Sequence, residues 1–224
     1  MNHSSLPIIL LLTIILSSSL RAEDCDVPAP VLTQLSEKFG VDNREACKII
    51  DVITIQVTEA QNYIIQIGDS NIKYNEKTRS GGLIDTTIEK HYINEDATIQ
   101  VTSLNNNNGP KDYYIKAYLQ HLADLSYKGI YNQVKLVFYP NNMKLLEDNK
   151  NPNQLVFQVF QDFIGCRTVD GEKCYKDVTD KRFYVSVTNI QSSKREIKIQ
   201  AVAAVAVYDY DKFHAQNGPY QNNK

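Results

Sequence analysis

The four cysteines are the residues of this 224-residue chain with the clearest predicted chemistry. They fall into two local pairs, Cys25 with Cys47 and Cys166 with Cys174. Four cysteines allow three pairings, and we predict two disulfides that join these local pairs. The second is the better supported, because an Asp170-Gly171 step favours a hairpin that places its two cysteines opposite each other. Zinc binding is disfavoured because no CxxC motif occurs, and a catalytic thiol would need a base that the sequence does not indicate.

The other ionisable residues form no known catalytic or nucleotide-binding motif. The four histidines are scattered, and the chain contains no HExxH, GxSxG, P-loop or GxGxxG motif. Asp177 and Asp180 could bind calcium, but we interpret them as an exposed strand edge with a turn because only two carboxylates are local. We therefore predict no metal and no cofactor. A formal net charge of −2 without a basic block argues against nucleic-acid binding.

The N-terminal residues show the succession of segments that is typical of a signal peptide. Residues 8–16 form an uncharged apolar run, which is followed by three serines and then by Ala22. A membrane-crossing helix needs about 20 apolar residues, so this run is too short to be a good anchor. We predict a cleaved signal peptide over residues 1–22, with cleavage after Ser19 as the alternative.

Two acidic residues argue against a lipid anchor on the first cysteine. Glu23 and Asp24 precede Cys25, where a lipid-modified cysteine needs small residues. We therefore expect a secreted or periplasmic protein with no stable membrane span after cleavage.

Residues 23–80 are predicted to form a small segment of helices and one hairpin. Apolar spacing and capping residues indicate the helices, whereas alternating β-branched side chains favour the strands. The predicted elements are helices over 28–40 and from Asp42 onward, and strands over 52–58 and 63–67.

Residues 83–211 have a more regular pattern, which predicts an α+β domain. Long antiparallel strands combined with amphipathic helices are typical of this class. The predicted elements are helices over 83–93 and 111–126, and strands over 97–104, 132–139, 154–165, 174–188 and 196–208. Residues 212–224 are polar and are predicted to be a disordered tail.

This domain resembles the nuclear transport factor 2-like (NTF2-like, cystatin-related cone) superfamily. It is similar in particular to a set of exported NTF2-like domains of uncharacterised function from Bacteroidetes. The matching stretches are residues 99–105, 114–122, 131–139, 161–163 and 175–187. The resemblance implies a curved antiparallel sheet with helices on one face. The cysteine pair around Asp170-Gly171 and the alanine-rich strand over 197–207 depart from the family pattern.

The same resemblance implies a cone that can enclose a pocket. Some family members are isomerases or dehydratases that use Asp, His and Tyr side chains. The candidate pocket residues here are Tyr114, Tyr118, His121, Asp124 and Asp162. His121 and Asp124 are three residues apart and can share one helix face. We nevertheless favour a packing role for the tyrosines and a solvent-exposed position for His121 and Asp124, because nothing else converges on a reaction.

We therefore expect an exported, non-catalytic module that contacts another protein, with a homodimer through the sheet as the resemblance implies. One alternative is a small-ligand binder, or a lyase or isomerase, that uses the cone cavity. Another is a periplasmic assembly subunit that resembles the NTF2-like domains of conjugation and type IV secretion machines. This last alternative requires the first helix to be retained.

Overall fold

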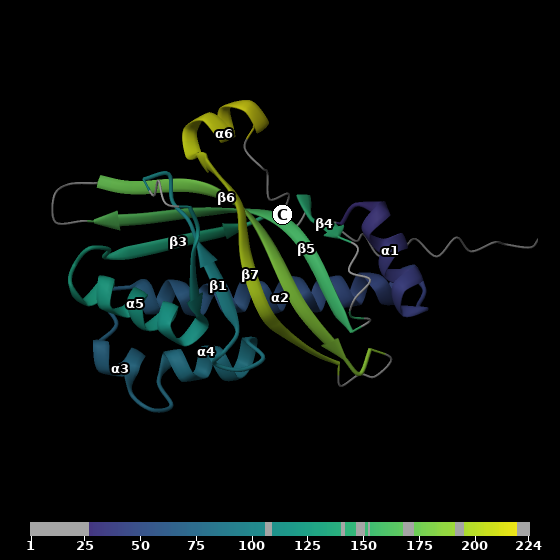
Figure 1. Ribbon diagram of the computed structural model, residues 1–224, viewed down its shortest axis with the longest axis horizontal. Helices are drawn as coiled ribbons and strands as arrows, with labels where there is room; N and C mark the ends of the chain where they lie inside the picture. The colour runs from purple at the N-terminus through teal and green to yellow at the C-terminus, as the bar shows by residue number, and fades with distance from the viewer. Residues whose placement is uncertain are drawn as a thin grey trace, which may run out of the picture.

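The computed structural model of the protein describes residues 27–105, 109–139, 142–146, 151, 153–167, 173–190 and 195–218. In these residues, helices pack against both faces of a curved, unclosed sheet (Figure 1). The predicted α+β class with a curved sheet is confirmed, whereas the expected placement of helices on one face alone is wrong, because residues 210–217 form a helix on the other face. The predicted signal peptide, residues 1–22, lies outside the described residues.

Seven strands of the described part of the chain form one sheet in the order β2-β1-β7-β6-β5-β3, and β4 pairs with the edge of β5 that β3 also uses. Neighbouring strands are antiparallel except β1 and β7, which are parallel. The strands are β1 (Thr98–Val101), β2 (Lys111–Tyr114), β3 (Gln133–Phe138), β4 (Lys144–Leu146), β5 (Gln154–Arg167), β6 (Lys173–Thr188) and β7 (Glu196–Asp209). The prediction of the long strands β5, β6 and β7 is confirmed, whereas the short β4 was not predicted.

The helices are arranged around this sheet, with α2 running along one face (Figure 1). They are α1 (Ala29–Phe39), α2 (Asn43–Gly68), α3 (Tyr74–Thr78), α4 (Leu83–His91), α5 (Ile115–Tyr127) and α6 (Tyr210–Asn217). Helix α1 ends as predicted at Gly40, whose φ of 63° is a left-handed conformation that glycine adopts without a steric penalty.

The hairpin predicted over 52–58 and 63–67 is wrong, because both stretches belong to α2. The β-branched residues that alternate there also recur at helical spacing, and this spacing places Ile49, Ile53 and Val57 on one buried stripe. No Gly, Pro or Asn lies between the two predicted strands, at residues 59–62, except Asn62, and no residue there breaks the helix. Burial of the stripe against the sheet therefore outweighs the strand preference of the individual residues.

Helix α2 and the sheet share one hydrophobic core. Ile53 and Ile67 of α2 belong to the same buried cluster as Leu155, Val185 and Ile199 of the sheet. Replacing a buried isoleucine of this kind with alanine typically costs about 2–5 kcal/mol. The segment before residue 83 therefore supplies the central helix of the core.

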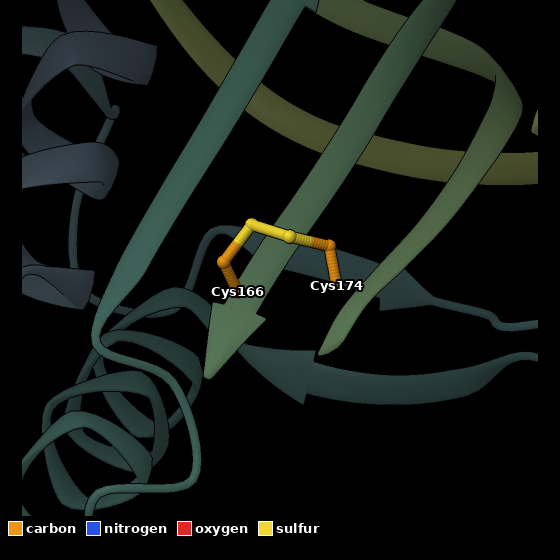
Figure 2. The surroundings of a disulfide bond; sticks show 2 residues. All are labelled: Cys166 and Cys174. Carbon is orange, nitrogen blue, oxygen red and sulfur yellow. A yellow bond between two sulfur atoms is a disulfide. The ribbon is translucent and has the colours of Figure 1, made fainter. Parts of the chain in front are cut away.

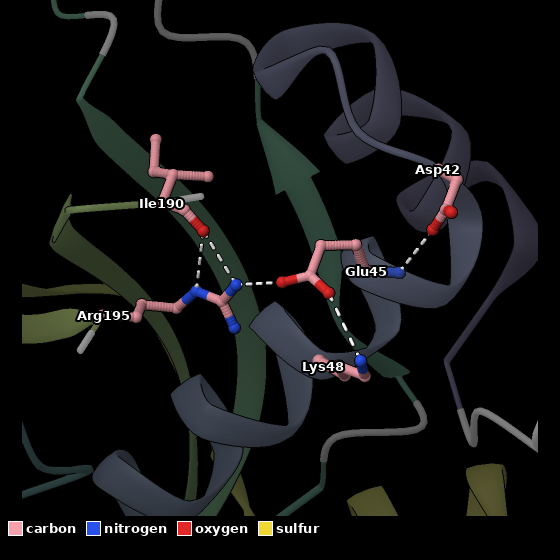
Figure 3. A network of polar contacts seen from close by, with 5 residues as sticks. All are labelled: Asp42, Glu45, Lys48, Ile190 and Arg195. Atoms are coloured by element: carbon pink, nitrogen blue, oxygen red, sulfur yellow. Dashed lines mark hydrogen bonds and ion pairs between the residues drawn. The ribbon is translucent and has the colours of Figure 1, made fainter. Parts of the chain in front are cut away.

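The first turn of α2 is held by a side-chain cap and by an ion pair (Figure 3). The Asp42 carboxylate accepts a hydrogen bond of 2.8 Å from the Glu45 backbone N–H and caps the helix. The Glu45 side chain pairs with Arg195, which precedes β7, and the hydrogen bond from Arg195 lowers the pKa of Glu45. Arg195 also donates hydrogen bonds of 2.8 and 3.3 Å to the carbonyl oxygen of Ile190. This network ties the start of α2 to the chain that connects β6 and β7.

The predicted disulfide between Cys166 and Cys174 is confirmed. The two residues are register partners on β5 and β6, and their Cα atoms lie 4.0 Å apart (Figure 2). The Asp170-Gly171 step that suggested this pair lies outside the described residues. Cys25 lies outside them as well, so the predicted Cys25–Cys47 bond stays a prediction.

The tail predicted to be disordered from residue 212 begins instead as part of helix α6. The Asp209 side chain caps this helix by accepting a hydrogen bond from the Lys212 backbone N–H. The Phe213 ring is buried and lies 4.9 Å from the ring of Phe160 on β5. This apolar contact helps to hold the helix on the sheet. Residues 219–224 lie outside the described residues.

Candidate functional site

A cavity of about 190 Å³ lies between α2, α5 and the sheet. Because the sheet curves and α2 crosses it, the two layers do not close completely at this point. The walls are mostly aromatic and aliphatic, and a smaller set of polar groups faces the same space. The apolar and aromatic lining includes Val57, Ile64, Tyr92, Ile99, Tyr118, Leu122, Tyr131, Phe163, Phe183 and Ile199.

Strand β6 supplies several of the polar groups of this cavity from alternate positions. Side chains of a strand point to opposite faces in turn, so every second residue faces the helices. The residues of β6 that line the cavity are Tyr175, Asp177, Thr179, Lys181 and Phe183. Their register partners on β5 include Phe163 and Gln161, which line it as well. We call this helix-covered side of the sheet the inner face and its opposite side the outer face.

Asp177 is the buried carboxylate of the inner face, with only 2% of its surface exposed. The Tyr175 hydroxyl donates a hydrogen bond of 2.6 Å to Asp177 Oδ2 and accepts one of 2.9 Å from the Leu104 backbone N–H. The second oxygen, Oδ1, has no hydrogen-bond partner among the described residues. Burial raises the pKa of Asp177 above its ordinary value, against the smaller lowering effect of Tyr175. Burial and the bond to Asp177 raise the pKa of Tyr175 to about 12.

Lys181 is the basic residue of the same cavity. Its Nζ lies 3.4 Å from the carbonyl oxygen of Gln100, a long contact for a charged donor. Burial disfavours the ammonium form and lowers the pKa of Lys181 to about 8, although the nearby Asp177 charge acts in the opposite direction. At pH 7, roughly a tenth of the side chains with such a pKa are neutral amines.

Several other groups in the cavity are neutral. Burial raises the pKa of Tyr118 to about 12 and also raises the pKa of Tyr92 and of Tyr131, so their hydroxyl groups stay protonated. The Gln61 side chain on α2 is buried, and its Nε2 has no hydrogen-bond partner among the described residues. The cavity therefore combines aromatic walls with an unpaired acceptor and an unpaired donor.

Of the five predicted pocket residues, Tyr118 and His121 line the cavity. Tyr118 is half-buried, whereas His121 is exposed and stacks on Tyr113 with the ring centroids 6.1 Å apart. Tyr114 lies outside the cavity and is 61% exposed. The helix predicted from residue 111 is wrong over residues 111–114, which form β2. Because side chains alternate along this strand, Tyr113 points into the cavity and Tyr114 points away from it.

The two predicted carboxylates of the pocket also lie elsewhere. Asp124 is on the side of α5 that faces α3, where it accepts hydrogen bonds from the Tyr74 hydroxyl at 2.7 Å and from Gln120 Nε2 at 3.2 Å. The bond from Tyr74 lowers the pKa of Asp124. Asp162 is on the outer face, because it occupies a position of β5 between the inward-facing Gln161 and Phe163.

Asp162 belongs to a second polar cluster, which lies beneath α6. The carboxylate is 1% exposed and accepts a hydrogen bond of 2.5 Å from the Tyr139 hydroxyl. Its other oxygen lies 3.2 Å from Nε2 of His214 on α6. Because both oxygens have partners, this cluster joins β5 to α6 and leaves no unpaired atom on the carboxylate.

The prediction of an exposed edge at Asp177 and Asp180 is wrong. Both side chains are buried, and they face opposite sides of the sheet because they are three residues apart on a strand. On the outer face, Asp180 Oδ2 accepts a hydrogen bond of 2.6 Å from Gln158 Nε2, whereas its Oδ1 has no hydrogen-bond partner among the described residues. The two carboxylates therefore cannot bind one calcium ion together.

The residues that sequence reasoning missed are the inward positions of β6 and Gln61. No sequence signal separates the β6 set from its neighbours, because the intervening positions include the polar Lys176 and Asp180 as well. The signal for Gln61 is its place on the buried helical stripe of α2, which the hairpin predicted over 52–58 and 63–67 does not contain.

Within the described ranges, no group of three His, Cys, Asp or Glu side chains is close enough to hold a metal ion. In the same part of the chain, no helix is both long and apolar enough to cross a membrane. Comparison with family models, curated proteins and solved structures finds no match to this chain.

Proposed function

We propose that this protein binds a small, largely apolar ligand in the cavity between α2, α5 and the sheet. The cavity of about 190 Å³ limits the ligand to about one ring. For comparison, an apolar protein cavity of about 150 Å³ binds benzene. The aromatic walls favour a flat ligand, because offset or edge-on aromatic contacts add to the free energy of apolar burial.

The observation that carries this proposal is the pair of unpaired polar atoms at the cavity, Asp177 Oδ1 and Gln61 Nε2. Buried polar groups in proteins almost always have a hydrogen-bond partner, because an unmade bond costs about 1–3 kcal/mol. A ligand that carries a donor for Asp177 and an acceptor for Gln61 would satisfy both. We expect the ligand to be apolar over its ring and to have one or two such polar substituents.

This function is favoured over docking of a second protein through the sheet. The inner face is covered by α2 and α5, and part of the outer face is covered by α6 through the contact of Phe213 with Phe160. The strands that were expected to form a homodimer interface thus already have intramolecular partners over part of both faces. The cavity, in contrast, is open to a molecule of the right size.

Benzyl alcohol, a one-ring compound with one hydroxyl group, is the probe for this proposal. Saturation-transfer NMR and calorimetric titration of the full chain should both detect its binding. Ala60 lines the cavity, so Ala60→Leu should occupy part of the space and weaken binding by at least tenfold. Thr58→Leu adds the same side chain to the exposed side of α2 and serves as the matched control. Absence of binding to the wild-type chain, or equal binding to both variants, would refute the proposal.

We also propose that the protein acts outside the cytoplasm after removal of residues 1–22, and that its domain is NTF2-like. The disulfide between Cys166 and Cys174 is compatible with an oxidising compartment. The curved sheet with helices on its inner face is compatible with the family resemblance. An intact-mass measurement on protein recovered from the periplasm or the culture medium tests the export proposal. A mass that retains residues 1–22 would contradict it.

A further inference from the structure

Lys181 differs from an ordinary surface lysine in what surrounds its amine. It projects from β6 into a space walled mainly by rings and aliphatic groups, with Phe183 two residues away on the same face. The one hydrogen bond of its Nζ within the described residues is the 3.4 Å contact with the Gln100 carbonyl. Among the described residues no carboxylate forms an ion pair with Lys181, and the nearby charge of Asp177 only partly offsets the effect of burial on the ammonium form. The site therefore stabilises the ammonium form poorly.

An amine in such a site is chemically useful because the neutral form is the nucleophile. Desolvation in an apolar pocket is one of the ways in which proteins activate lysine for reaction with carbonyl compounds. The pKa of Lys181, lowered to about 8 by burial, agrees with this geometry. A ligand held against the aromatic walls would have its substituents within the same small volume as the amine.

We propose that Lys181 forms a reversible imine with a one-ring aldehyde or ketone bound in the cavity. This inference rests on the proposed function and names the chemical class of the ligand. It also assigns to the protein a covalent step that simple binding would not require.

The step is balanced without any oxidant or reductant. The lone pair of neutral Nζ attacks the carbonyl carbon, and the electron pair of the C=O π bond moves to the oxygen, which gains a proton to give a carbinolamine. The nitrogen loses two protons in total and the oxygen gains two, so that one water molecule leaves as the C=N bond forms. Water reverses the reaction.

Asp177 faces the same cavity and can exchange protons during this step. Burial raises the pKa of the Asp177 carboxyl, so its protonated form is easier to populate than that of a surface aspartate. The carboxyl can give a proton to the departing oxygen and recover the proton that nitrogen releases. The hydrogen bond from Tyr175 fixes one of its oxygens, which leaves the other for the exchange.

The experiment uses the full chain with benzaldehyde at pH 8 and sodium cyanoborohydride, which converts an imine into a stable secondary amine. Intact mass should increase by one benzyl group, and peptide mapping should place that group on Lys181. Lys181 should be labelled at least about tenfold faster than the average surface lysine, because more of it is neutral at this pH. Labelling spread evenly over the surface lysines would overturn the proposal.

Two lysines of one strand supply the matched variants. Lys181→Arg removes the inward amine, whereas Lys176→Arg changes an exposed lysine of β6 on the outer face. Fast labelling should disappear in the first variant and persist in the second. If Lys181→Arg does not fold, a competition experiment on the wild-type chain takes its place, in which bound benzyl alcohol should slow the labelling of Lys181 by benzaldehyde. Fast labelling that benzyl alcohol does not slow would overturn the proposal.

The same probes distinguish the two proposals. Binding of benzyl alcohol without labelling of Lys181 by benzaldehyde would retain the binding function and refute the imine. Failure of both would refute the binding function together with the inference that rests on it.

Discussion

Two buried aspartates on opposite faces of the sheet, Asp162 and Asp177, have different surroundings. Asp162 on β5 and Asp177 on β6 are at neighbouring register positions, since Asp162 pairs with Val178 and Phe163 pairs with Asp177. On the outer face, Tyr139 and His214 contact the two oxygens of Asp162. On the inner face, Tyr175 contacts one oxygen of Asp177, and the side chain borders an open cavity.

Asp180 on the outer face also has an unpaired oxygen, so it is the cavity beside Asp177 that makes its carboxylate available for binding. A buried carboxylate whose oxygens are both paired contributes to a specific packing of its neighbours, and its removal leaves those neighbours unpaired. A buried carboxylate with one unpaired oxygen retains an unmet desolvation cost. Four experiments test this contrast, from the largest expected change in stability to the smallest.

Removal of the two carboxylates should affect stability unequally. We expect Asp162→Ala to lower the free energy of unfolding by about 3 kcal/mol, because it removes the buried acceptor of the Tyr139 hydroxyl and of His214 Nε2. Asp177→Ala should lower it by about 1 kcal/mol or less, since loss of the unpaired oxygen offsets loss of the Tyr175 bond. Urea unfolding at pH 7 measures both. Equal losses would remove the distinction between the faces.

The pH dependence of stability should report on Lys181 of the inner face. The pKa of its amine falls from 10.5 to about 8 on folding, so the native state binds this proton less tightly than the unfolded state does. The Lys181 contribution to stability is therefore fully present above pH 10.5 and is lost as the pH falls toward 8 and below. The upper limit of this loss is about 3 kcal/mol.

The readout is the difference in unfolding free energy between the wild-type chain and Lys181→Met, measured from pH 8 to 10.5. This difference should move in favour of the wild-type chain as the pH rises. Lys176→Met, which removes an exposed lysine of the outer face, is the control for the general effect of losing a lysine. A flat difference for Lys181→Met would show that its amine is not desolvated.

The disulfide should stabilise the fold without a preference for either face of the sheet, because it joins one end of β5 to the neighbouring end of β6. For a bond between residues eight positions apart, chain entropy predicts a loss of about 2.5 kcal/mol in Cys166→Ser/Cys174→Ser. Benzyl alcohol binding should change by less than twofold in the folded double variant, since neither sulfur lines the cavity. A selective loss of binding would mean that the bond shapes the inner face.

The smallest effects are expected for the two tyrosines that donate to these carboxylates. Tyr139→Phe and Tyr175→Phe remove matched hydroxyl groups from the outer and the inner face. We expect each to lower the free energy of unfolding by about 1 kcal/mol. Only Tyr175→Phe should also alter benzyl alcohol affinity, because Tyr175 lines the cavity. An equal change of affinity in both variants would contradict the assignment of one face to binding.

The strands of the sheet were predictable because their local pattern and their tertiary role agree. Alternating β-branched and aromatic residues indicated β5 and β6, and the Asp170-Gly171 step indicated the pairing of Cys166 with Cys174. Helix α2 could not be predicted from the local pattern, because its β-branched residues fit both the spacing of a strand and the spacing of a helix. Only packing against the sheet decides between the two.

The site was harder to predict than the fold. Alternation shows that Asp177 and Asp180 face opposite sides, but it does not show which side faces α2 and α5. The same ambiguity placed Asp162 in the predicted pocket. The helix that covers Asp162 on the outer face, α6, was itself predicted to be a disordered tail. The identity of the inner residues therefore depends on where the helices pack, and this is a property of the whole chain.

The disulfide between Cys166 and Cys174 also constrains how this protein can evolve. It fixes the register of β5 against β6, and a strand reverses the face of every residue when it shifts by one position. Deletion of a single residue between Cys174 and Lys181 would turn the lysine to the outer face and bring Arg182 into the cavity. New ligand preferences can therefore arise here through substitutions at every second position, whereas single-residue insertions and deletions within the strand would exchange the two surfaces.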